Sequence, residues 1–459
     1  MESRIEKDSM GEILVPADKY WGAQTQRSLQ NFQIGEQTMP KELVRNIAMV
    51  KKAAACANAD LGVLSEEKKR LIVQVCDEIM DGKWDAQFPL SVWQTGSGTQ
   101  TNMNVNEVIA HRAEEIRGGS LQSDTFISPN DDVNKSQSTN DVFPTAMRMA
   151  VAIQLLDKTI PALTRLQQEL EKKAVEFHEV IIVGRTHMQD ATPLRLGCEF
   201  SAYASQLSYG IAALRHTLPH LMELPVGGTA VGSGLNTPPH YDEVCVRYIR
   251  QFTNKEFTNA ANKYEAMSSH DALVETSGAI KQLAVSLMKI ANDIRLSASG
   301  PRSGIGEIVL PQNEPGSSIM PGKVNPTQCE ALCMVCAQLI GHDATVGVAG
   351  MQGHWQLNVF MPVIAYDMMT STRLLADACD SFACHCVSGI EANRERIETN
   401  LKQSLMLVTA LNTHIGYHNA AKISQHAYKQ GISLKEAALE LGLVSEHDFD
   451  SWVDPQKMV

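Results

Sequence analysis

The chain has 459 residues, with 52 acidic and 40 basic side chains and a formal net charge of -12. This length exceeds that of one small core, so two or three domains are expected, and an aromatic content of 5% argues against an all-β sandwich. The negative charge gives no support for a nucleic-acid partner. Ten cysteines, an N-terminus unlike a targeting peptide and the lack of an apolar run of about 18 residues predict a cytoplasmic protein without a membrane span.

Helical periodicity dominates the chain. In residues 151–177, apolar side chains such as Ile160, Leu163 and Leu166 recur at intervals of three or four residues, and this spacing predicts one buried helical face. The same pattern predicts helices over residues 239–251, 268–297 and 327–347, and no alternation of strands and helices indicates a parallel sheet. We therefore expect a mainly α fold. Its expected parts are an N-terminal domain at 1–137, a central long-helix bundle at 138–392 and a small helical C-terminal domain at 393–459.

Short corners rich in small polar residues separate these helices. Residues 95–104 read Thr-Gly-Ser-Gly-Thr-Gln-Thr-Asn-Met-Asn and precede the helical stretch 105–116, while residues 136–141 read Ser-Gln-Ser-Thr-Asn-Asp ahead of Pro144. A helix N-terminus presents unpaired amides and binds anions. Each corner alone is more simply a helix cap, but their recurrence, together with Thr-His-Met-Gln-Asp at 186–190, favours a site for an anionic ligand.

The longest corner, residues 301–326, holds five Pro, four Gly and three Ser. Loops of this length are usually functional or disordered, and apolar residues such as Ile308, Ile319 and Met320 indicate an ordered one. A Gly-rich loop can close over a ligand and exclude water. Lys323 and Asn325 could stabilise charge developing on a substrate oxygen. An ordinary surface loop ending in a helix cap is the alternative.

Taken in order, these corners and the loop sequence Gly-Ser-Ser-Ile-Met-Pro-Gly-Lys-Val-Asn-Pro at 316–326 resemble the motifs of the class II fumarases, in the fumarase/aspartase superfamily. The resemblance runs from about residue 10 to the C-terminus. It implies a fumarase/aspartase-like fold and the reversible, stereospecific interconversion of fumarate plus water and L-malate, a step of the tricarboxylic acid cycle. It also implies a homotetramer in which three chains build each active site. No metal or other cofactor is implied, and the expected ligands are small dicarboxylates.

The resemblance also implies residue roles. Ser317 is the base on a mobile loop, and His187, oriented by Glu330, belongs to the acid half of the reaction, with Lys323 as a further catalytic group. On its own, Glu330 is equally an acid favoured by the dipole of a first helical turn, and His187 a structural histidine. The residues implied to contact the substrate carboxylates are Ser97, Gly98, Thr99, Ser138, Thr139, Asn140, Thr186, Ser318, Lys323, Val324 and Asn325.

One stretch departs from the family. Many members have a second dicarboxylate site at a His-Pro-Asn-Asp turn, whereas this chain has Ser128, Pro129, Asn130 and Asp131. Serine is shorter than histidine and cannot carry its charge. The turn is therefore better interpreted as an ordinary Pro-Asn-Asp turn, and we expect the second site to be weak or absent.

The chemistry can be argued without the resemblance. Removing a proton beside a carboxylate is feasible only if fixed donors meet the resulting charge, and one such donor is typically worth about 2.7 to 4 kcal/mol. A serine base such as Ser317 needs a strongly positive surrounding to exist as an alkoxide, which Lys323 and glycine amides favour. Histidine titrates near neutrality and suits the leaving hydroxide.

Three other interpretations compete. Cys329, Cys333 and Cys336 have a spacing close to that of some iron–sulfur sites, but a helix-core pattern surrounds them, in which cysteine acts as a small hydrophobe. Cys384 to Cys386 with the histidine between them form an incomplete tetrahedral set. Aspartases typically have alanine where this chain has Gly322 and glutamine where it has His187, so both positions here take the fumarase form. A crystallin-like structural protein would be expected to lose motif residues, and this chain keeps those of the main site.

Overall fold

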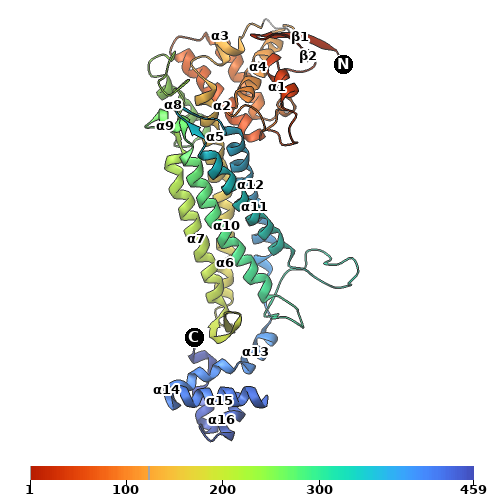
Figure 1. Cartoon of the computed structure of the whole chain (residues 1–459), viewed down its shortest axis with the longest axis vertical. Coiled ribbons are helices and arrows are strands. Elements are labelled where there is room, and N and C mark those ends of the chain that lie inside the picture. The colour runs from red at the N-terminus through yellow and green to blue at the C-terminus, as the bar shows by residue number, and fades with distance from the viewer. Residues whose placement is uncertain (1, 122–124) are drawn as a thin grey trace. The chain divides into compact units, whose positions relative to one another are not determined.

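The computed structural model describes residues 2–121 and 125–459 (Figure 1). As predicted, the fold is mainly α, and its strands form small two-stranded sheets. The helices are α1 (Ala23–Asn31), α2 (Lys41–Asp60), α3 (Glu66–Met80), α4 (Thr99–Ile116), α5 (Thr139–Gln154), α6 (Ile160–Glu176), α7 (Leu196–Leu221), α8 (Tyr241–Thr253), α9 (Lys263–Ser268), α10 (Asp271–Ser297), α11 (Thr327–Gly350), α12 (Met361–His385), α13 (Arg394–Gln403), α14 (Asn412–Ile415), α15 (Tyr417–Gln430), α16 (Leu434–Glu440) and α17 (Glu446–Trp452). The strands are β1 (Ser3–Asp8), β2 (Gly11–Pro16), β3 (Ile181–Thr186), β4 (Gln189–Arg195), β5 (Glu223–Leu224), β6 (Thr258–Asn259), β7 (Ile308–Val309), β8 (Gly353–His354), β9 (Leu357–Asn358) and β10 (Glu391–Ala392).

The chain forms two compact units that alternate along the sequence. Unit 1 comprises Met1–Pro161, Gly210–Ala284 and Cys336–Ala376, and unit 2 comprises Ala162–Tyr209, Val285–Val335 and Asp377–Val459. The divisions fall within the helices α6, α7, α10, α11 and α12, which make up the predicted long-helix bundle. The domain boundaries expected after residues 137 and 392 stay predictions.

In unit 1, α2 is the central packing element. It contacts α3, α5 and α8, because its apolar side chains, among them Leu43, Ile47 and Val50, are fully buried. The bundle helices approach closely where small residues allow it: a Cβ added at Gly210 on α7 would lie 2.2 Å from the Leu283 side chain on α10. This packing fixes the starts of α4 and α5, which carry the two predicted polar corners.

In unit 2, Phe177, directly after α6, packs against Phe200 of α7. The ring centroids are 5.3 Å apart with an interplanar angle of 65°, a favourable edge-to-face arrangement. The antiparallel β3–β4 hairpin joins these two helices. At the C-terminal end, α15, α16 and α17 bury a small core of their own that includes Leu411, Ile423 and Phe449.

The predicted elements differ from the observed ones at four points. Helix α4 begins at Thr99 rather than at residue 105, so that much of the first polar corner lies within the helix. The stretch 151–177 is continuous only through a π-helical turn, Leu155–Thr159, between α5 and α6. The helix predicted from 268 begins at Asp271, after the separate short helix α9. The long loop is not wholly irregular, because Ile308–Val309 pairs with Glu391–Ala392, a partner more than 80 residues away that no local pattern reveals.

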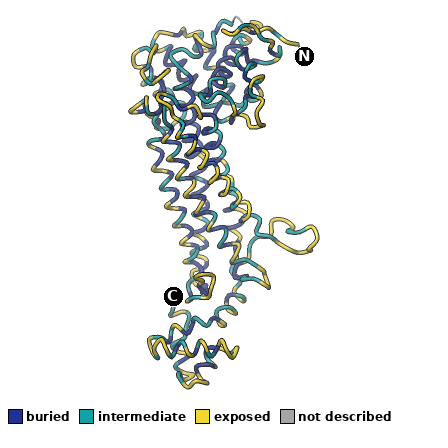
Figure 2. The backbone as a smooth tube through the Cα atoms, viewed as in Figure 1, coloured by how far each residue is buried: buried dark blue, intermediate teal, exposed yellow. Residues whose placement is uncertain are grey.

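Helix α11 is unusual in its surface. It is long and apolar enough to cross a membrane by length and composition, yet only 28% of its most apolar window is buried. Its exposed apolar side chains include Met334 and Val348, and Met351 directly follows the helix; each is more than half accessible. Figure 2 shows how exposed positions alternate with buried ones along the long helices. An apolar face of this kind is typical of a surface that packs against another protein chain.

Candidate active site

The first polar corner, in unit 1, is held by close backbone packing. Gly98 is the N-cap of α4 with φ +74°, and a Cβ there would lie 2.3 Å from the Phe143 ring of α5. The hydroxyls of Ser97 and Thr99 are hydrogen-bonded to each other at 2.8 Å. Glycine is therefore required at position 98 by both conformation and space, and the two hydroxyls lie together at the positive end of α4.

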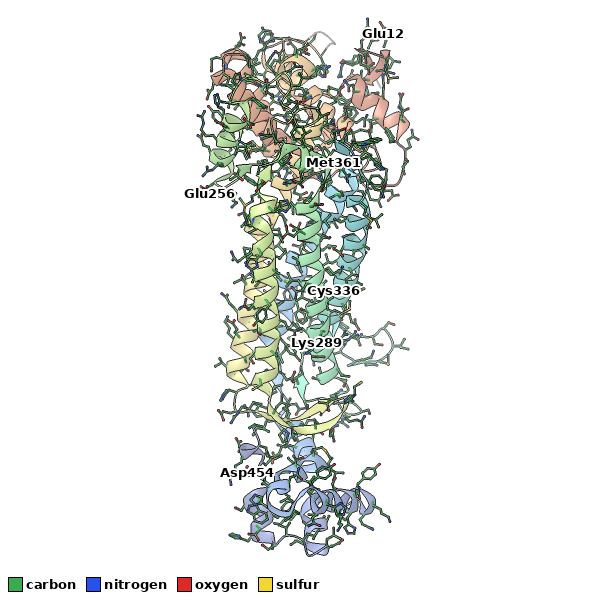
Figure 3. The ribbon with its side chains drawn as sticks, turned by 60° about the vertical axis from the view of Figure 1, so that its left-hand side comes forward. Glu12, Glu256, Lys289, Cys336, Met361 and Asp454 are labelled. Atoms are coloured by element: carbon green, nitrogen blue, oxygen red, sulfur yellow. The ribbon has the colours of Figure 1, made fainter. Side chains whose placement is uncertain are left out.

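The same corner is also held by the first residue of α12 and the segment just before that helix. Met361, labelled in Figure 3, donates its backbone N–H to the Gly96 carbonyl at 3.0 Å. A Cβ at Gly96 would lie 1.4 Å from the Val359 carbonyl oxygen. The segment 96–99 is thus a rigid corner.

The second polar corner begins α5. Ser138 is its N-cap in a capping box, with its hydroxyl accepting from Asn140 and its amide donating to Asp141. The buried Asp141 carboxylate also accepts from the amides of Gly227 and Thr229, both at about 3 Å, and burial raises its pKa against the effect of these donors. The segment that contains Gly227 and Thr229 therefore supports the 136–141 corner.

The two corners are brought together within unit 1. Asn102 on α4 donates to the hydroxyl of Thr139 on α5 at 3.0 Å, and Asn140 donates to the Ala230 carbonyl at 2.8 Å. The structure thus places Ser97, Gly98 and Thr99 beside Ser138, Thr139 and Asn140, as two adjacent helix N-termini. Such an arrangement suits a carboxylate.

In unit 2, Thr186 and His187 occupy the tip of the β3–β4 hairpin. Thr186 pairs with Gln189, which leaves His187 and Met188 as the two turn residues, with φ of +54° and +59°. This is the pattern of a type I′ turn, which normally uses Asn-Gly. A non-glycine residue held at positive φ costs of order 1–3 kcal/mol and is typical of functional sites. The turn presents the exposed His187 side chain outward.

An ion pair that the sequence analysis missed holds this hairpin. The Arg185 guanidinium donates twice to the Glu307 carboxylate, at 2.7 and 2.8 Å, and Asn400 donates to the same carboxylate at 2.9 Å. Glu307 is only 2% exposed, and the pair raises the pKa of Arg185. The contact links the hairpin carrying His187 to the start of the long loop. Its partners are 122 residues apart, so spacing gave no signal for it.

The long loop closes on itself around Ser317. The Gly316 amide donates to the Lys323 carbonyl at 2.9 Å, and Asn325 donates through Nδ2 to the Gly316 carbonyl at 2.6 Å. Between these ends, Met320 to Lys323 form a turn with Gly322 at φ +79°. The Ser317 hydroxyl accepts two backbone N–H groups, from Ile319 at 3.2 Å and Met320 at 2.9 Å. Two donors aimed at one oxygen favour its anionic form.

The remaining loop residues are less constrained. Ser318, Lys323 and Val324 are exposed, and Glu330 is an exposed residue of the first turn of α11. Within the described ranges, no hydrogen bond or ion pair joins Glu330 to His187, so the orientation of the histidine by this carboxylate stays a prediction. The apolar residues expected to hold the loop do so only in part, because Ile308 is buried but Ile319 is 83% exposed.

The predicted site residues therefore form three groups. Ser97 to Thr99 and Ser138 to Asn140 form one group in unit 1, whereas the hairpin tip and the loop are separate groups in unit 2.

The turn at Ser128 is a satisfied cap. Its hydroxyl donates to the Asp131 carboxylate at 3.0 Å and accepts the Asp131 amide at 3.1 Å, and its amide donates to Asp132. Pro129 follows as the first residue of a short π-helix, and Asn130 and Asp131 line a cavity of about 420 Å³. The predicted weakness of a second site here stays a prediction.

The cysteines of α11 are part of the packing between helices. Cys329 and Cys336 are buried on α11, and Cys333 donates to Asn292 at 3.8 Å. Cys329 shares a hydrogen bond with Cys386, which lowers the pKa of Cys329 and raises that of Cys386. Among the described residues, no group of three or more His, Cys, Asp or Glu side chains is arranged to hold a metal ion.

Comparison with known proteins decides the family. A model of the family described as Lyase matches residues 11–341, and one described as Fumarase C C-terminus matches residues 407–459. The chain is 62% identical to a protein of Pasteurella multocida named Fumarate hydratase class II and 61% identical to one of Haemophilus influenzae, covering 100% of this chain and 99% of each relative. The chain belongs to the class II fumarate hydratase family.

The fold agrees with this membership. The crystal structure of the recombinant class II fumarase from Schistosoma mansoni superimposes with a TM-score of 0.96 at 46% identity, covering 100% of this chain and 99% of that one. The resemblance drawn from the corners and the loop, and the mainly α fold expected from it, are confirmed. Membership of the class II fumarate hydratase family also makes this chain a lyase and not a crystallin-like structural protein.

Proposed function

We propose that this class II fumarate hydratase interconverts fumarate plus water and L-malate with Ser317 as the base. The observation that carries the assignment is the loop around Ser317, whose hydroxyl accepts two backbone amides. In the dehydration direction, Ser317 as alkoxide takes the proton beside one carboxylate of L-malate. The hydroxyl group then leaves from the neighbouring carbon with a proton supplied by the group that contains His187, and fumarate and water result. The tricarboxylic acid cycle is the expected setting of this reaction.

The charge that develops on the substrate needs fixed donors. In the proposed site, Lys323 and Asn325 meet the carboxylate that becomes doubly charged, and Thr186, Ser318 and Val324 complete its contacts. The paired helix N-termini at Ser97, Gly98, Thr99, Ser138, Thr139 and Asn140 hold the substrate carboxylates. Each donor aimed at the developing charge is worth about 2.7–4 kcal/mol, and Glu330 is proposed to orient His187.

We further propose that the protein is a homotetramer whose active sites each combine residues of three chains. Two observations support it. The exposed apolar side chains of α11, Met334 and Val348, together with Met351 directly after it, resemble the apolar core of a protein–protein interface. The proposed catalytic residues Lys323, on the loop, and His187, on its strained turn, are exposed in the single chain, and so is the apolar Ile319 beside Ser317.

Mixing two inactive variants tests the shared site. Co-expression of His187→Asn with Ser317→Ala yields mixed tetramers, and if different chains supply these residues, about a quarter of the sites receive both intact groups. The expected result is roughly a quarter of the unmodified activity, far above that of either variant alone. Activity no higher than the mean of the two variants would show that one chain supplies both groups.

The proposed setting of the enzyme is the cytoplasm. Two cysteines, Cys198 and Cys384, are exposed thiols that form no disulfide. Free exposed thiols are typical of a reducing compartment. Growth of the host with a tagged chain, followed by fractionation, tests this placement: activity in the soluble cytoplasmic fraction supports it, and activity in the membrane or periplasmic fraction contradicts it.

A further inference from the structure

A lysine without an ion-pair partner lies behind the second polar corner. Lys51 on α2 is fully buried, although buried charges are normally paired. Its ammonium donates to the side-chain carbonyls of Asn134 at 2.8 Å and Gln137 at 3.0 Å. In the described part of the chain it makes no ion pair. Burial lowers the pKa of Lys51 to about 7, against the opposing effect of Asp141.

The contacts of Lys51 lead to the substrate corner. The Asn134 oxygen that accepts from Lys51 also accepts from Asn102 at 3.1 Å, and the same Asn102 amide group donates to the Thr139 hydroxyl at 3.0 Å. Because the Thr139 oxygen is used as an acceptor, its own proton is free to point toward a ligand. Gln137 is the residue directly before the Ser138 cap.

The nearby Asp141 carboxylate makes no direct ion pair with the lysine, although its charge favours the ammonium form of Lys51. Asp141 is committed to the amides of Ser138, Gly227 and Thr229, and burial raises its pKa. The other titratable group facing Lys51 is the thiol of Cys76 on α3, whose pKa is raised by burial, so it remains uncharged. The direct hydrogen-bond partners of the buried ammonium are thus two neutral acceptors, and its cationic form lies beneath the corner.

We infer that Lys51 is a positioning residue for substrate binding: it orients the Asn134–Gln137 segment and, through Asn102, the Thr139 hydroxyl, and its charge favours a carboxylate at Ser138 to Asn140. This inference rests on the proposed placement of the substrate at that corner. Lys51 itself does not touch the substrate. It acts on ground-state binding, so it affects KM more than kcat.

The adjacent Lys52 is a matched control. It lies next to Lys51 on α2 but pairs with Asp77 at 2.6 Å and contacts the Phe252 ring, away from the corner. Lys51→Met and Lys52→Met remove the same charge from the same helix. For Lys51→Met we expect KM for fumarate to rise about tenfold, because losing one interaction with a charged group weakens binding by about this factor. We expect kcat to change less. For Lys52→Met we expect both parameters to stay near those of the unmodified protein.

The pH dependence gives a readout that a purely structural role would not move. A lysine whose pKa lies about 7 is charged below that pH and neutral above it, so the affinity for succinate, a non-reacting dicarboxylate, should fall as pH rises through about 7. In Lys51→Met this fall should be absent, and in Lys52→Met it should persist. A KM for Lys51→Met within about twofold of the Lys52→Met value, or an unchanged pH profile, would overturn the inference.

Two further variants keep the test decisive. If Lys51→Met does not fold, Gln137→Met removes one acceptor and leaves the lysine; it should raise KM by roughly threefold, and no rise overturns the inference. Ser138→Ala separates the inference from the proposed site. If Ser138→Ala leaves KM unchanged, the substrate placement itself is wrong, whereas a raised KM in Ser138→Ala with a normal KM in Lys51→Met rejects only the role of Lys51.

Discussion

Replacing Ser317 by alanine removes one oxygen from the loop. That oxygen accepts the amides of Ile319 and Met320 at 3.2 and 2.9 Å. A hydrogen bond to a charged group is worth about 1.5–3 kcal/mol, against about 0.5–1.5 kcal/mol for a neutral one. The two amides therefore stabilise the alkoxide over the hydroxyl by roughly 2–3 kcal/mol, and the loop is built to favour the basic form.

The expected loss follows from these numbers. Ser317→Ala removes the proton acceptor, and positioned bases contribute at least about 100-fold to the rate, which corresponds to about 2.7 kcal/mol. The free energy of unfolding should change by less than about 1 kcal/mol, because water can replace the hydroxyl at this partly exposed position. The loop should keep its closure, since the contacts between Gly316, Lys323 and Asn325 use no serine atom.

The assay is turnover of L-malate, followed by fumarate absorbance, with thermal unfolding measured in parallel. Ser303→Ala is the control, because Ser303 is an exposed serine earlier in the same loop. We expect Ser303→Ala to retain activity and Ser317→Ala to lose it with an unchanged melting temperature. Turnover of Ser317→Ala within about threefold of the control would refute the assignment of Ser317 as the base.

Three other predictions concern the remaining site features. His187→Asn should lower turnover by at least about 100-fold while the protein stays folded, because it removes a proton-transfer group; near-normal turnover would remove this histidine from the mechanism. Gly98→Ala should lower the free energy of unfolding by about 2–4 kcal/mol through positive φ and ring overlap, whereas Gly118→Ala, at φ +82° with nothing within 4 Å of the added Cβ, should cost only about 1 kcal/mol. Equal losses on chemical denaturation would refute the packing argument. Calorimetry should detect one dicarboxylate per protomer, and a Ser128→His variant should show at most an added weak event with little change in turnover. Two events in the unmodified protein, one abolished by Asp131→Ala, would show that the second site works without histidine.

A metal-free mechanism makes one more prediction. Chelation by EDTA should leave turnover unchanged, because Cys329 and Cys336 are buried in a helix core rather than arranged as ligands. An absorbance spectrum of the purified protein should lack the brown colour of an iron–sulfur cluster. Loss of activity with EDTA, restored by iron or zinc, would contradict this account.

The sequence predicted the local structure around those candidate site residues that lie in contiguous motifs. Ser138 could be recognised because a cap must precede its helix, and Ser317 because the loop motif is contiguous. The periodicity of Ile160, Leu163 and Leu166 predicted a buried face, and all three are buried.

Long-range partners left no such signal. The Arg185–Glu307 pair joins residues 122 positions apart, and the strand at Ile308 pairs with a segment beyond residue 390. Lys51 had one local clue, since it follows Val50 on the apolar face of an alanine-rich helix. A lysine there is expected to extend toward solvent, and only the three-dimensional packing of α2 against α3, α5 and α8 shows that it cannot.

The most direct test of the central claim is a single absorbance measurement on the purified protein. With L-malate as substrate, the ultraviolet absorbance of the fumarate double bond should rise to an equilibrium value, and with L-aspartate it should stay flat. Those two results together identify a fumarate hydratase. A rise with L-aspartate, or no rise with L-malate, would contradict the account.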